Sequence, residues 1–327
     1  MRESKKMQSS TQASSLKPQA NYVPPLPYND FNTHLRRMFN CRVQKIPLSA
    51  GFTCPNRDGR INEQPCIYCD EHGSAAWPNR IIPPIRQQMT DGIRRVEKKY
   101  PQAKFMAYFQ AFSNTYAPVE TLHKLYTEAL ETDRRVIGLA VGTRPDCLSD
   151  QIWELLTDLS RRYYFWLELG LQSAYNKTLQ AICRGHNRKQ FTDAVQKAHS
   201  LGIRVCAHVI LGLPGESKRH MMRTANYLNA LGIEGIKLHN LYILQNTKLA
   251  ELYTAGLYRP LELNEYAGLT AEFLARLSPN VIIQRLVSDP PVDRLIAPLW
   301  AANKGEILNA VRDKMWEDDL RQGILLI

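Results

Sequence analysis

The stretch RVCAHVILGLPGESKRHMMRTANYLNALGIEGIKLHNL, residues 204–241, decides the fold. Its first part, 204–211, is an apolar and β-branched run that predicts a strand buried on both faces, as parallel strands are. Residues 218–231 have an amphipathic helical pattern, and Gly232 follows where a helix C-cap is expected. A second apolar run, 235–241, predicts another strand. This strand–helix–strand order is typical of a βα unit in a parallel sheet.

The same alternation of apolar runs and amphipathic patterns extends over most of the chain. The predicted strands are 43–48, 105–110, 136–141, 164–171, 204–211 and 235–241, and the predicted helices between them are 84–99, 118–131, 149–161, 188–201 and 218–231. Six such units predict an α/β fold with a partial parallel barrel of (β/α)6 type, similar to an incomplete TIM barrel. A doubly wound open sheet is the alternative.

Three segments are expected along the chain. Residues 1–27 are rich in Ser, Gln and Pro, which predicts a disordered tail. Residues 28–245 are expected to hold the barrel. Residues 246–327 are expected to form a small α/β appendage that packs on the barrel, with a helix at 264–277, a strand at 281–287 and a final helix at 304–316.

The composition is that of a soluble globular protein, because 44% of the 327 residues are hydrophobic and 22% are charged. The sequence has no run of about 18 apolar residues, so we expect no membrane span. Residues 1–20 are polar and lack the apolar centre of a secretory signal. Seven cysteines, an odd number, do not suit a disulfide framework. A reducing, cytoplasmic location is therefore expected.

Basic residues exceed acidic ones by 11, and residues 1–60 alone hold ten Lys or Arg against three Asp or Glu. A basic surface attracts polyanions such as RNA, or acidic partner proteins. Arg36, Arg37, Arg42 and Lys45 are the candidate members of such a surface. A solvated face without a specific partner explains the same charge equally well.

Three cysteines follow the first predicted strand, in the segment GFTCPNRDGRINEQPCIYC at 51–69. Only two residues separate Cys66 from Cys69, so both sulfurs can reach one metal centre, and turn-forming residues bring Cys54 back toward them. Three thiolates suit an iron–sulfur cluster with one iron left for another ligand. They also suit zinc with His72 as the fourth ligand. Three buried thiols without a ligand are the remaining reading.

Candidate ligand-binding residues lie at the ends of the predicted strands, where a parallel barrel collects its functional groups. Arg144 has a fork of N–H groups that suits a carboxylate. Glu168 and Gln172 are four residues apart in one strand and therefore face the same side. A charge inside such a strand is costly unless it is paired or used. The full set is Gln110, Ser113, Arg144, Glu168, Gln172 and Gly212.

Taken together, these segments resemble the radical S-adenosylmethionine (radical SAM) superfamily. The matching motifs are GFTCPNRDG, AYFQAFSNTYA, VGTRPDCL, WLELGLQSAYNKTL, RGH, HVILGLPGE, GIKLHNLYIL and APLW, in this order, between about residues 43 and 300. The cysteine spacing, C-x11-C-x2-C, departs from the C-x3-C-x2-C that is usual in the superfamily. The longer gap resembles the branch of the Elongator catalytic subunit and, more closely, the YhcC-like family.

The resemblance implies a 4Fe–4S cluster on Cys54, Cys66 and Cys69, with S-adenosylmethionine (SAM) bound to the open iron. Reduction of the cluster would cleave SAM and release a 5′-deoxyadenosyl radical, which takes hydrogen from the substrate. The same resemblance implies the SAM-binding positions: Gln110 and Ser113 near the methionine amino group, Arg144 on a carboxylate, Glu168 and Gln172 near the ribose and methionine carboxylate, and Gly212 near the adenine.

Two substrate classes stay open for such an enzyme, RNA and a small molecule. Lys237, His239 and Asn240 are expected to line the substrate side at the end of the sixth strand. The cluster needs an electron from outside, so a flavodoxin- or ferredoxin-type reductant is the expected partner. The alternative function is a zinc-stabilised basic protein that binds nucleic acid. A catalytic acid or base and the oligomeric state are not assigned.

Overall fold

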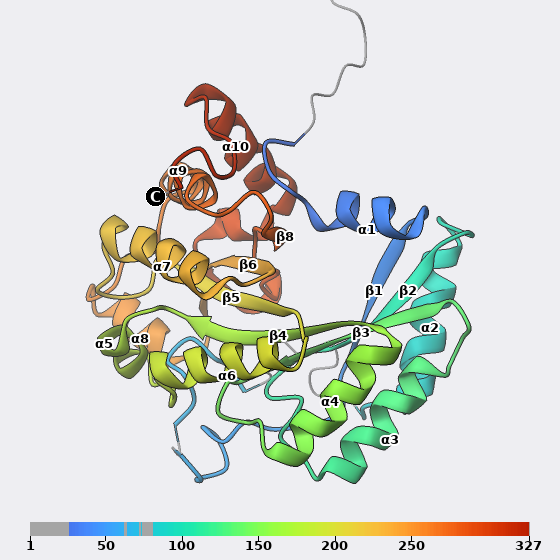
Figure 1. Ribbon diagram of the computed structural model, residues 1–327. Coiled ribbons are helices and arrows are strands. Elements are labelled where there is room, and N and C mark those ends of the chain that lie inside the picture. The colour runs from blue at the N-terminus through green and yellow to red at the C-terminus, as the bar shows by residue number, and fades with distance from the viewer. Residues whose placement is uncertain (1–25, 62–63, 72, 74–80, 327) are drawn as a thin grey trace, which may run out of the picture.

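Seven parallel strands form one sheet in the computed structural model, which describes residues 26–61, 64–71, 73 and 81–326. The strand order, β1-β2-β3-β4-β5-β6-β8, follows the sequence without a reversal. A doubly wound sheet reverses its order at a switch point, so that alternative is wrong here. The sheet curls into an open half-barrel (Figure 1), which confirms the prediction of a partial parallel barrel.

The strands of this sheet and the helices agree closely with the predicted segments. The strands are β1 (Val43–Leu48), β2 (Lys104–Phe109), β3 (Val136–Thr143), β4 (Tyr164–Gln172), β5 (Val205–Leu211), β6 (Gly235–Asn240) and β8 (Ile282–Arg285). The helices are α1 (Phe31–Phe39), α2 (Ile85–Glu97), α3 (Val119–Leu130), α4 (Asp150–Arg162), α5 (Asn176–Ala181), α6 (Arg188–Ser200), α7 (Lys218–Leu231), α8 (Lys248–Thr254), α9 (Leu263–Ala275) and α10 (Lys304–Glu317).

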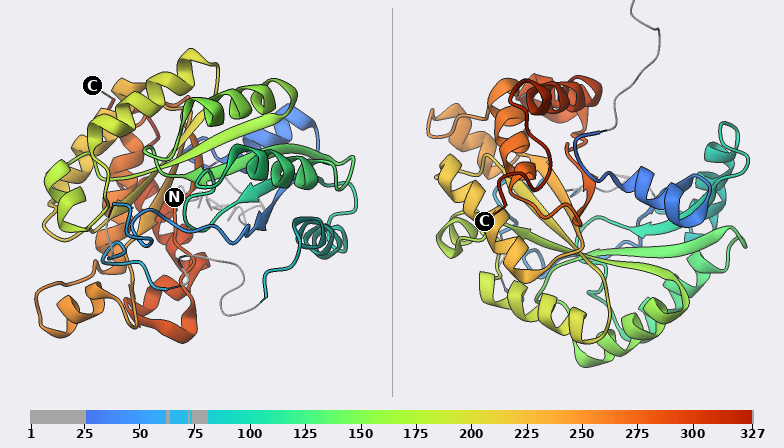
Figure 2. Two further views of the ribbon diagram at one scale, coloured as in Figure 1. Left: turned by 90° about the horizontal axis from the view of Figure 1, so that it is seen from below. Right: turned by 45° about the horizontal axis from the view of Figure 1, so that its top comes forward.

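Helices cover the convex face of the curled sheet. Helices α2, α3, α4, α6 and α7 lie along this face, as the views in Figure 2 show, and α9 packs beside α7 and α10. One hydrophobic cluster joins these helices to outward-facing strand residues such as Leu48, Phe109 and Leu167. The central strands are therefore buried on the convex side by the helix layer, which accounts for their nearly continuous apolar sequences.

The apolar segment predicted at 281–287 forms β8 and pairs in parallel with β6, with Gly235 opposite Ile282. We expected this strand in an appendage, whereas the structure makes it the seventh strand of the barrel sheet. Helices α8 and α9 lie between β6 and β8 and provide the crossover that two parallel strands require. An apolar run does not reveal locally which sheet it joins. The domain limits at 28–245 and 246–327 stay predictions, and most of the predicted tail lies outside the described residues.

Helix α1 was not predicted, because nine residues with the sequence FNTHLRRMF give only a short, mixed pattern. Asp30 is its N-cap and accepts a hydrogen bond from a backbone N–H of the first turn at 3.0 Å. Phe31 and Leu35 lie one turn apart and are buried against residues that begin the strands, among them Val43 and Ile282. The helix therefore fills the concave side of the half-barrel at the N-terminal ends of its strands.

The two edge strands approach each other across the interior. Lys45 on β1 donates a hydrogen bond to the side-chain carbonyl of Gln284 on β8, with Nζ and Oε1 2.7 Å apart. The backbone N–H of Ile283 donates to the carbonyl of Asn29 at 2.8 Å, so the segment before α1 lies on the β8 edge. These contacts hold the sheet curled and cover an edge that would otherwise be open to another chain.

A small antiparallel sheet supports the segment that follows β1. It consists of β7 (Ile243–Leu244) and β9 (Leu295–Ala297). Ile67 of the cysteine loop packs into a hydrophobic cluster with residues of this sheet, and its carbonyl accepts a hydrogen bond from the N–H of Leu249 at 2.8 Å. Among the residues that the structure describes, no helix is both long and apolar enough to cross a membrane.

Truncation of Leu35 tests whether α1 is part of the core. Leu35 is 2% exposed, whereas Met38 on the same helix is 49% exposed. We expect Leu35→Ala to lower the free energy of unfolding by about 2–4 kcal/mol, because it leaves a cavity beneath the strands. Met38→Ala is the matched control and should change it by less than about 0.5 kcal/mol. Urea unfolding followed by circular dichroism measures both, and equal effects would contradict the placement of α1.

Candidate functional site

The cysteine loop follows β1 and begins at the C-terminal end of the sheet. Cys54 and Cys66 are buried and Cys69 is partly exposed. Two tight turns shape the loop, since the N–H of Arg57 donates to the carbonyl of Cys54 at 2.8 Å and the N–H of Cys69 donates to that of Cys66 at 2.8 Å. These two turns therefore set the course of the backbone at Cys54 and at the pair Cys66 and Cys69.

Each of the three cysteine sulfurs has one N–H donor beside it. Arg144 Nη1 donates to Cys54 Sγ at 3.7 Å, and Asn56 Nδ2 donates to Cys66 Sγ at 3.6 Å. Arg57 Nη2 donates to the third sulfur, that of Cys69, at 3.3 Å. Asn56 and Arg57 were not among the candidate site residues of the sequence analysis. Their direct contact with the sulfurs depends on how the loop folds back on itself, which the spacing does not reveal.

One cavity of about 230 Å³ collects nearly all the residues that the strand ends and the cysteine spacing single out. Its wall includes Cys54, Cys66, Cys69, Gln110, Ser113, Arg144, Glu168 and Gln172. These residues come from the cysteine loop, the β2 and β3 ends and β4, so the parallel strands bring them together as the fold predicts. Their assignment to particular atoms of a cofactor stays a prediction.

Gly212 does not belong to this set, because it is outside the residues that line the cysteine cavity. Its φ of +89° requires glycine, and a Cβ there would lie 2.9 Å from Leu261 Cδ1. Its carbonyl accepts a hydrogen bond from Tyr258 Oη at 2.8 Å. The predicted contact of Gly212 with adenine stays a prediction, and the observed contacts give this glycine a packing role.

Arg144 already holds a carboxylate, and it is the carboxylate of Asp146. Nε and Nη2 of Arg144 donate to the two Asp146 oxygens at 2.9 and 2.7 Å, and Nη1 donates to the carbonyl of Arg184 at 2.8 Å. Arg144 as a whole residue is only 1% exposed. The paired N–H groups of Arg144 thus bind a carboxylate two residues away in the same chain, and the predicted contact with a ligand carboxylate stays a prediction. The contacts therefore favour a role in placing Cys54 over a role in binding the SAM carboxylate.

Glu168 is the centre of a buried ionic network inside the half-barrel. Lys45 Nζ from β1 lies 2.7 Å from Oε1, and His208 Nε2 from β5 lies 2.9 Å from Oε2. Lys237 from β6 donates to the same Oε2 and also to Tyr108 Oη, the latter at 2.9 Å. Both carboxylate oxygens thus have protein partners. Lys45 lies in the interior and does not belong to the expected basic surface.

Burial and the charges around Glu168 together shift the pKa values of this network. Burial alone would raise the pKa of the Glu168 carboxyl, but Lys237 and Lys45 outweigh burial and hold that pKa well below its ordinary value. Burial lowers the pKa of Lys45 to about 8 and the pKa of His208 to about 4, against the attraction of Glu168. His208 is therefore neutral at pH 7, and its Nε2–H donates to the carboxylate.

The end of β4 is strained where it meets the cavity. Gln172 has a φ of +72°, which non-glycine residues rarely adopt, and the pairing with β5 shifts register between Gly170 and Gln172. This bulge changes the alternation of the strand just beyond Glu168. Sparsely populated backbone conformations of this kind concentrate at ligand sites. Gln172 lines both this cavity and its neighbour.

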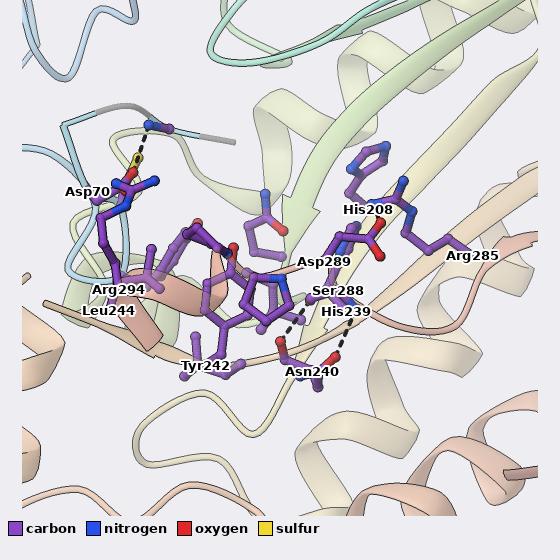
Figure 3. Close-up of a pocket in the computed structure, with 18 of the residues that line it drawn as sticks. Asp70, His208, His239, Asn240, Tyr242, Leu244, Arg285, Ser288, Asp289 and Arg294 are labelled. Atoms are coloured by element: carbon purple, nitrogen blue, oxygen red, sulfur yellow. Dashed lines mark hydrogen bonds and ion pairs between the residues drawn. The ribbon is translucent and has the colours of Figure 1, made fainter. Parts of the chain in front are cut away.

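A second cavity of about 430 Å³ adjoins the first, and Figure 3 shows its polar wall. Asp70 and Arg294 form an ion pair on one side, and Asn240 and Ser288 are hydrogen bonded on the other (Figure 3). The two cavities share a wall made by Tyr68, Cys69, Gly73, Gln110, Gln172, His208, His239 and Arg285. The contribution of the segment after β8 was not predicted, because it depends on the pairing of that strand.

Asn240 and His239 line the second cavity, and each has one buried polar atom without a hydrogen-bond partner among the described residues. Asn240 is 2% exposed, its Oδ1 accepts from the N–H of Ser288 at 2.8 Å, and its Nδ2 has no partner among the described residues. His239 Nε2 likewise has no partner among them, and burial holds the pKa of His239 well below its ordinary value. These two residues were predicted to line a substrate side. The cavity that they line opens onto Cys69.

The three thiols and the N–H donors beside them fit an iron–sulfur group. Within the described part of the chain, no three His, Cys, Asp or Glu side chains converge to hold one metal ion. The three thiols instead line a shared cavity, each with its own N–H donor, an arrangement that suits thiolate ligands of an iron–sulfur group. Burial raises the pKa of the Cys69 thiol to about 11, so a bound metal is what would make it a thiolate at neutral pH. His72, the expected zinc ligand, lies outside the described residues.

The chain belongs to the radical SAM superfamily. The family model described as the Radical SAM superfamily matches residues 50–228, and the Radical SAM C-terminal domain matches residues 233–317. Enzymes of this family use a 4Fe–4S cluster and SAM, so the predicted class of enzyme and its cofactors are confirmed. The matched range includes the cysteine loop and the ends of β2 to β5.

Two bacterial proteins are similar to this chain over nearly their whole length. YtqA of Bacillus subtilis is 37% identical over 90% of this chain and 92% of its own. YhcC of Escherichia coli is 36% identical over 84% of this chain and 88% of its own. The expected similarity to the YhcC-like family is thus confirmed. Among solved structures, the archaeal Elp3 of Methanocaldococcus infernus has the same fold, with a TM-score of 0.68 at 18% identity over 86% of this chain and 64% of that chain.

The neutral state of His208 predicts a pH dependence of stability. Its folded pKa of about 4 lies below the ordinary value of 6.5, so its contribution is complete above pH 6.5 and is lost as the pH falls toward 4. Between pH 7 and pH 5 this loss is about 2 kcal/mol. In His208→Gln an amide can still donate to Glu168 but does not titrate. The free energy of unfolding of this variant should therefore fall less over that range in parallel urea titrations, and an equal fall would contradict the buried neutral imidazole.

Proposed function

We propose that this chain is a radical SAM enzyme in which Cys54, Cys66 and Cys69 hold a 4Fe–4S cluster beside bound SAM. The observation that carries this proposal is the shared cavity that these cysteines line together with polar strand-end residues. When bound, the two cofactors supply a one-electron reductive cleavage of SAM that starts radical chemistry on a substrate. The protein contributes orientation, tuning of the cluster and exclusion of water.

The polar residues of the cysteine cavity differ in whether their hydrogen-bonding atoms are already engaged within the protein. Gln110 and Gln172 lie on the wall shared by both cavities and are proposed to bind polar groups of SAM. Ser113 is fully buried at the end of β2 and is proposed to act beside them. Glu168 and Arg144 have their polar atoms engaged within the protein, so we propose that they act by positioning their neighbours.

We propose that the substrate occupies the second cavity, next to the cysteine loop. Asn240 Nδ2 is a buried donor that has no partner among the described residues, and His239 is a neutral imidazole. Arg285 adds a cation that Asp289 balances, with Nη1 and Oδ2 3.3 Å apart. A group that accepts hydrogen bonds fits this wall. RNA and a small molecule both carry such groups, and the proposal retains the two classes.

The partner that donates the electron is proposed to be a flavodoxin- or ferredoxin-type protein in the cytoplasm. Arg36 and Arg37 are exposed on α1, which packs at the N-terminal ends of the strands, whereas the cysteine loop lies at the C-terminal ends. We therefore propose that the reductant docks at the cysteine-loop end, where Arg60 is exposed. An acidic partner would meet a complementary charge there.

Replacement of the loop cysteines tests the cluster. After anaerobic reconstitution, the protein should carry about four irons per chain, the content of this cluster type. Ala at Cys54, Cys66 or Cys69 should each abolish the charge-transfer absorbance and most of the iron, because each removes a ligand. Cys41→Ala is the control and should keep both. Stoichiometric zinc in the anaerobically purified protein without any uptake of iron would overturn the cluster in favour of a zinc-stabilised nucleic-acid-binding protein.

Gln172→Ala tests the SAM site separately from the cluster. We expect the iron content to stay normal and the affinity for SAM, measured by equilibrium dialysis, to fall about five- to tenfold, as the loss of one or two hydrogen bonds implies. Gln87→Ala, an exposed residue of α2, is the control. Unchanged affinity in Gln172→Ala would place SAM elsewhere. Gly212→Val is unsuited to this test, because its Cβ would collide with Leu261.

A further inference from the structure

The R-G-H motif at 184–186 has no part in the cofactor roles described above, yet it touches the cysteine loop. It belongs to the segment 182–186 between α5 and α6. The N–H of Ile67, next to Cys66, donates to the carbonyl of Ile182 at 3.2 Å. This segment and the cysteine loop are more than a hundred residues apart in sequence, so their contact is a product of the fold.

The carbonyls of this segment orient two of the three residues that donate to the sulfurs. Asn56 Nδ2 donates to the carbonyl of Cys183 at 2.7 Å and to that of Arg184 at 3.1 Å. Arg144 Nη1 donates to the same Arg184 carbonyl at 2.8 Å. Asn56 and Arg144 are the residues beside the sulfurs of Cys66 and Cys54. One carbonyl oxygen thus receives N–H groups from both donors.

Gly185 allows Asn56 and Arg144 to lie close to the backbone of the segment 182–186. Its φ is +80°, and a Cβ built on it would lie 2.2 Å from Asn56 Oδ1 and 3.0 Å from Arg144 Nη2. The first distance is far below any real carbon–oxygen contact. Any larger residue at this position therefore has to move Asn56 or the segment, in addition to the cost of a left-handed backbone.

The segment is itself held on β4. Arg184 Nη2 and His186 Nε2 both donate to the carbonyl of Gly170, at 3.0 and 2.8 Å. Burial lowers the pKa of His186 to about 3, so this imidazole is neutral and one proton on Nε2 satisfies the carbonyl. A Cβ built on Gly170 would lie 2.5 Å from Arg184 Nη2, so this glycine also leaves room for a side chain of the motif. The motif is therefore a rigid bridge between β4 and the cysteine loop.

We propose that the segment 182–186 is a positioning element that sets the reduction potential of the cluster, with Gly185 as its key residue. This inference rests on the proposed function and deepens it. Gly185 and the Arg184 carbonyl hold the N–H groups of Asn56 and Arg144 against two cysteine sulfurs, while Arg57 reaches the third independently. Hydrogen bonds to cluster sulfurs stabilise the more negative, reduced state and so raise the potential.

The test compares glycine variants that share the same backbone strain. Gly185→Ala carries the clash, whereas Gly202→Ala is the matched control, because Gly202 has a φ of +71° and open space where its Cβ would lie. Asn56→Leu removes one donor and keeps much of the side-chain volume. Arg144→Lys keeps the charge of the second donor and loses its fork. Each protein is reconstituted anaerobically, its iron is counted, and its midpoint potential is measured by a redox titration followed by electron paramagnetic resonance.

We expect Gly185→Ala, Asn56→Leu and Arg144→Lys to retain iron and to have more negative midpoint potentials than the wild-type protein. The expected size is about a tenfold lower ratio of reduced to oxidised cluster at the wild-type midpoint, which is about 59 mV for a one-electron couple. Gly202→Ala should match the wild type. If Gly185 acts through Asn56, adding Gly185→Ala to Asn56→Leu should shift the potential less than it does alone.

A normal potential in an iron-loaded Gly185→Ala protein would overturn the inference, as would an equal shift in Gly202→Ala. If Gly185→Ala takes up no iron, Asn56→Leu and Arg144→Lys decide, and normal potentials in both would overturn it. These failures differ from failure of the proposed function, in which the wild-type protein itself would take up no four-iron cluster.

Discussion

The carboxylate of Glu168 is the interaction on which the interior of the half-barrel depends. It lies on the central strand β4 and receives Lys45 from the edge strand β1, His208 from β5 and Lys237 from β6. Lys45 also donates a hydrogen bond to Gln284 on the opposite edge strand. The ion pairs of Glu168 can therefore form only when the sheet is curled. Removal of one partner from such a buried group is strongly unfavourable, because the remaining charges stay desolvated.

This ionic layer divides the concave side into two zones. On the side of the strand starts, α1 and aromatic residues such as Trp166 form an apolar core. On the side of the strand ends, the cysteine loop, the bulge at Gln172 and the second cavity carry the polar groups. The height of a residue along its strand therefore decides its role. Glu168 and Gln172 face the same side in the predicted strand, and both line the cysteine cavity. Glu168 lies in the ionic layer, whereas Gln172 lies beyond the bulge at the end of the strand.

Features that depend on a few neighbouring residues were predicted from the sequence, and features that depend on distant pairing were not. The strands followed from apolar runs, and the cysteine site followed from the pair Cys66 and Cys69. Lys45 was misplaced because its partner Glu168 lies 123 residues away. The strand at 281–287 was recognised but assigned outside the sheet for the same reason. The fork of Arg144 was anticipated, yet which carboxylate it holds depends on a turn that only the folded chain defines.

The position of α1 bears on the order in which the reductant and the substrate reach the site. Helix α1 closes the half-barrel at the N-terminal ends of its strands, so reactants have to enter at the C-terminal ends. The cysteine loop and the segment after β8 both lie at this end of the barrel, where Asp70 and Arg294 form an ion pair. A large substrate bound there would block the access of the reductant to the cysteine loop. Under the proposed function, we therefore expect the reductant to act before a large substrate binds in the second cavity.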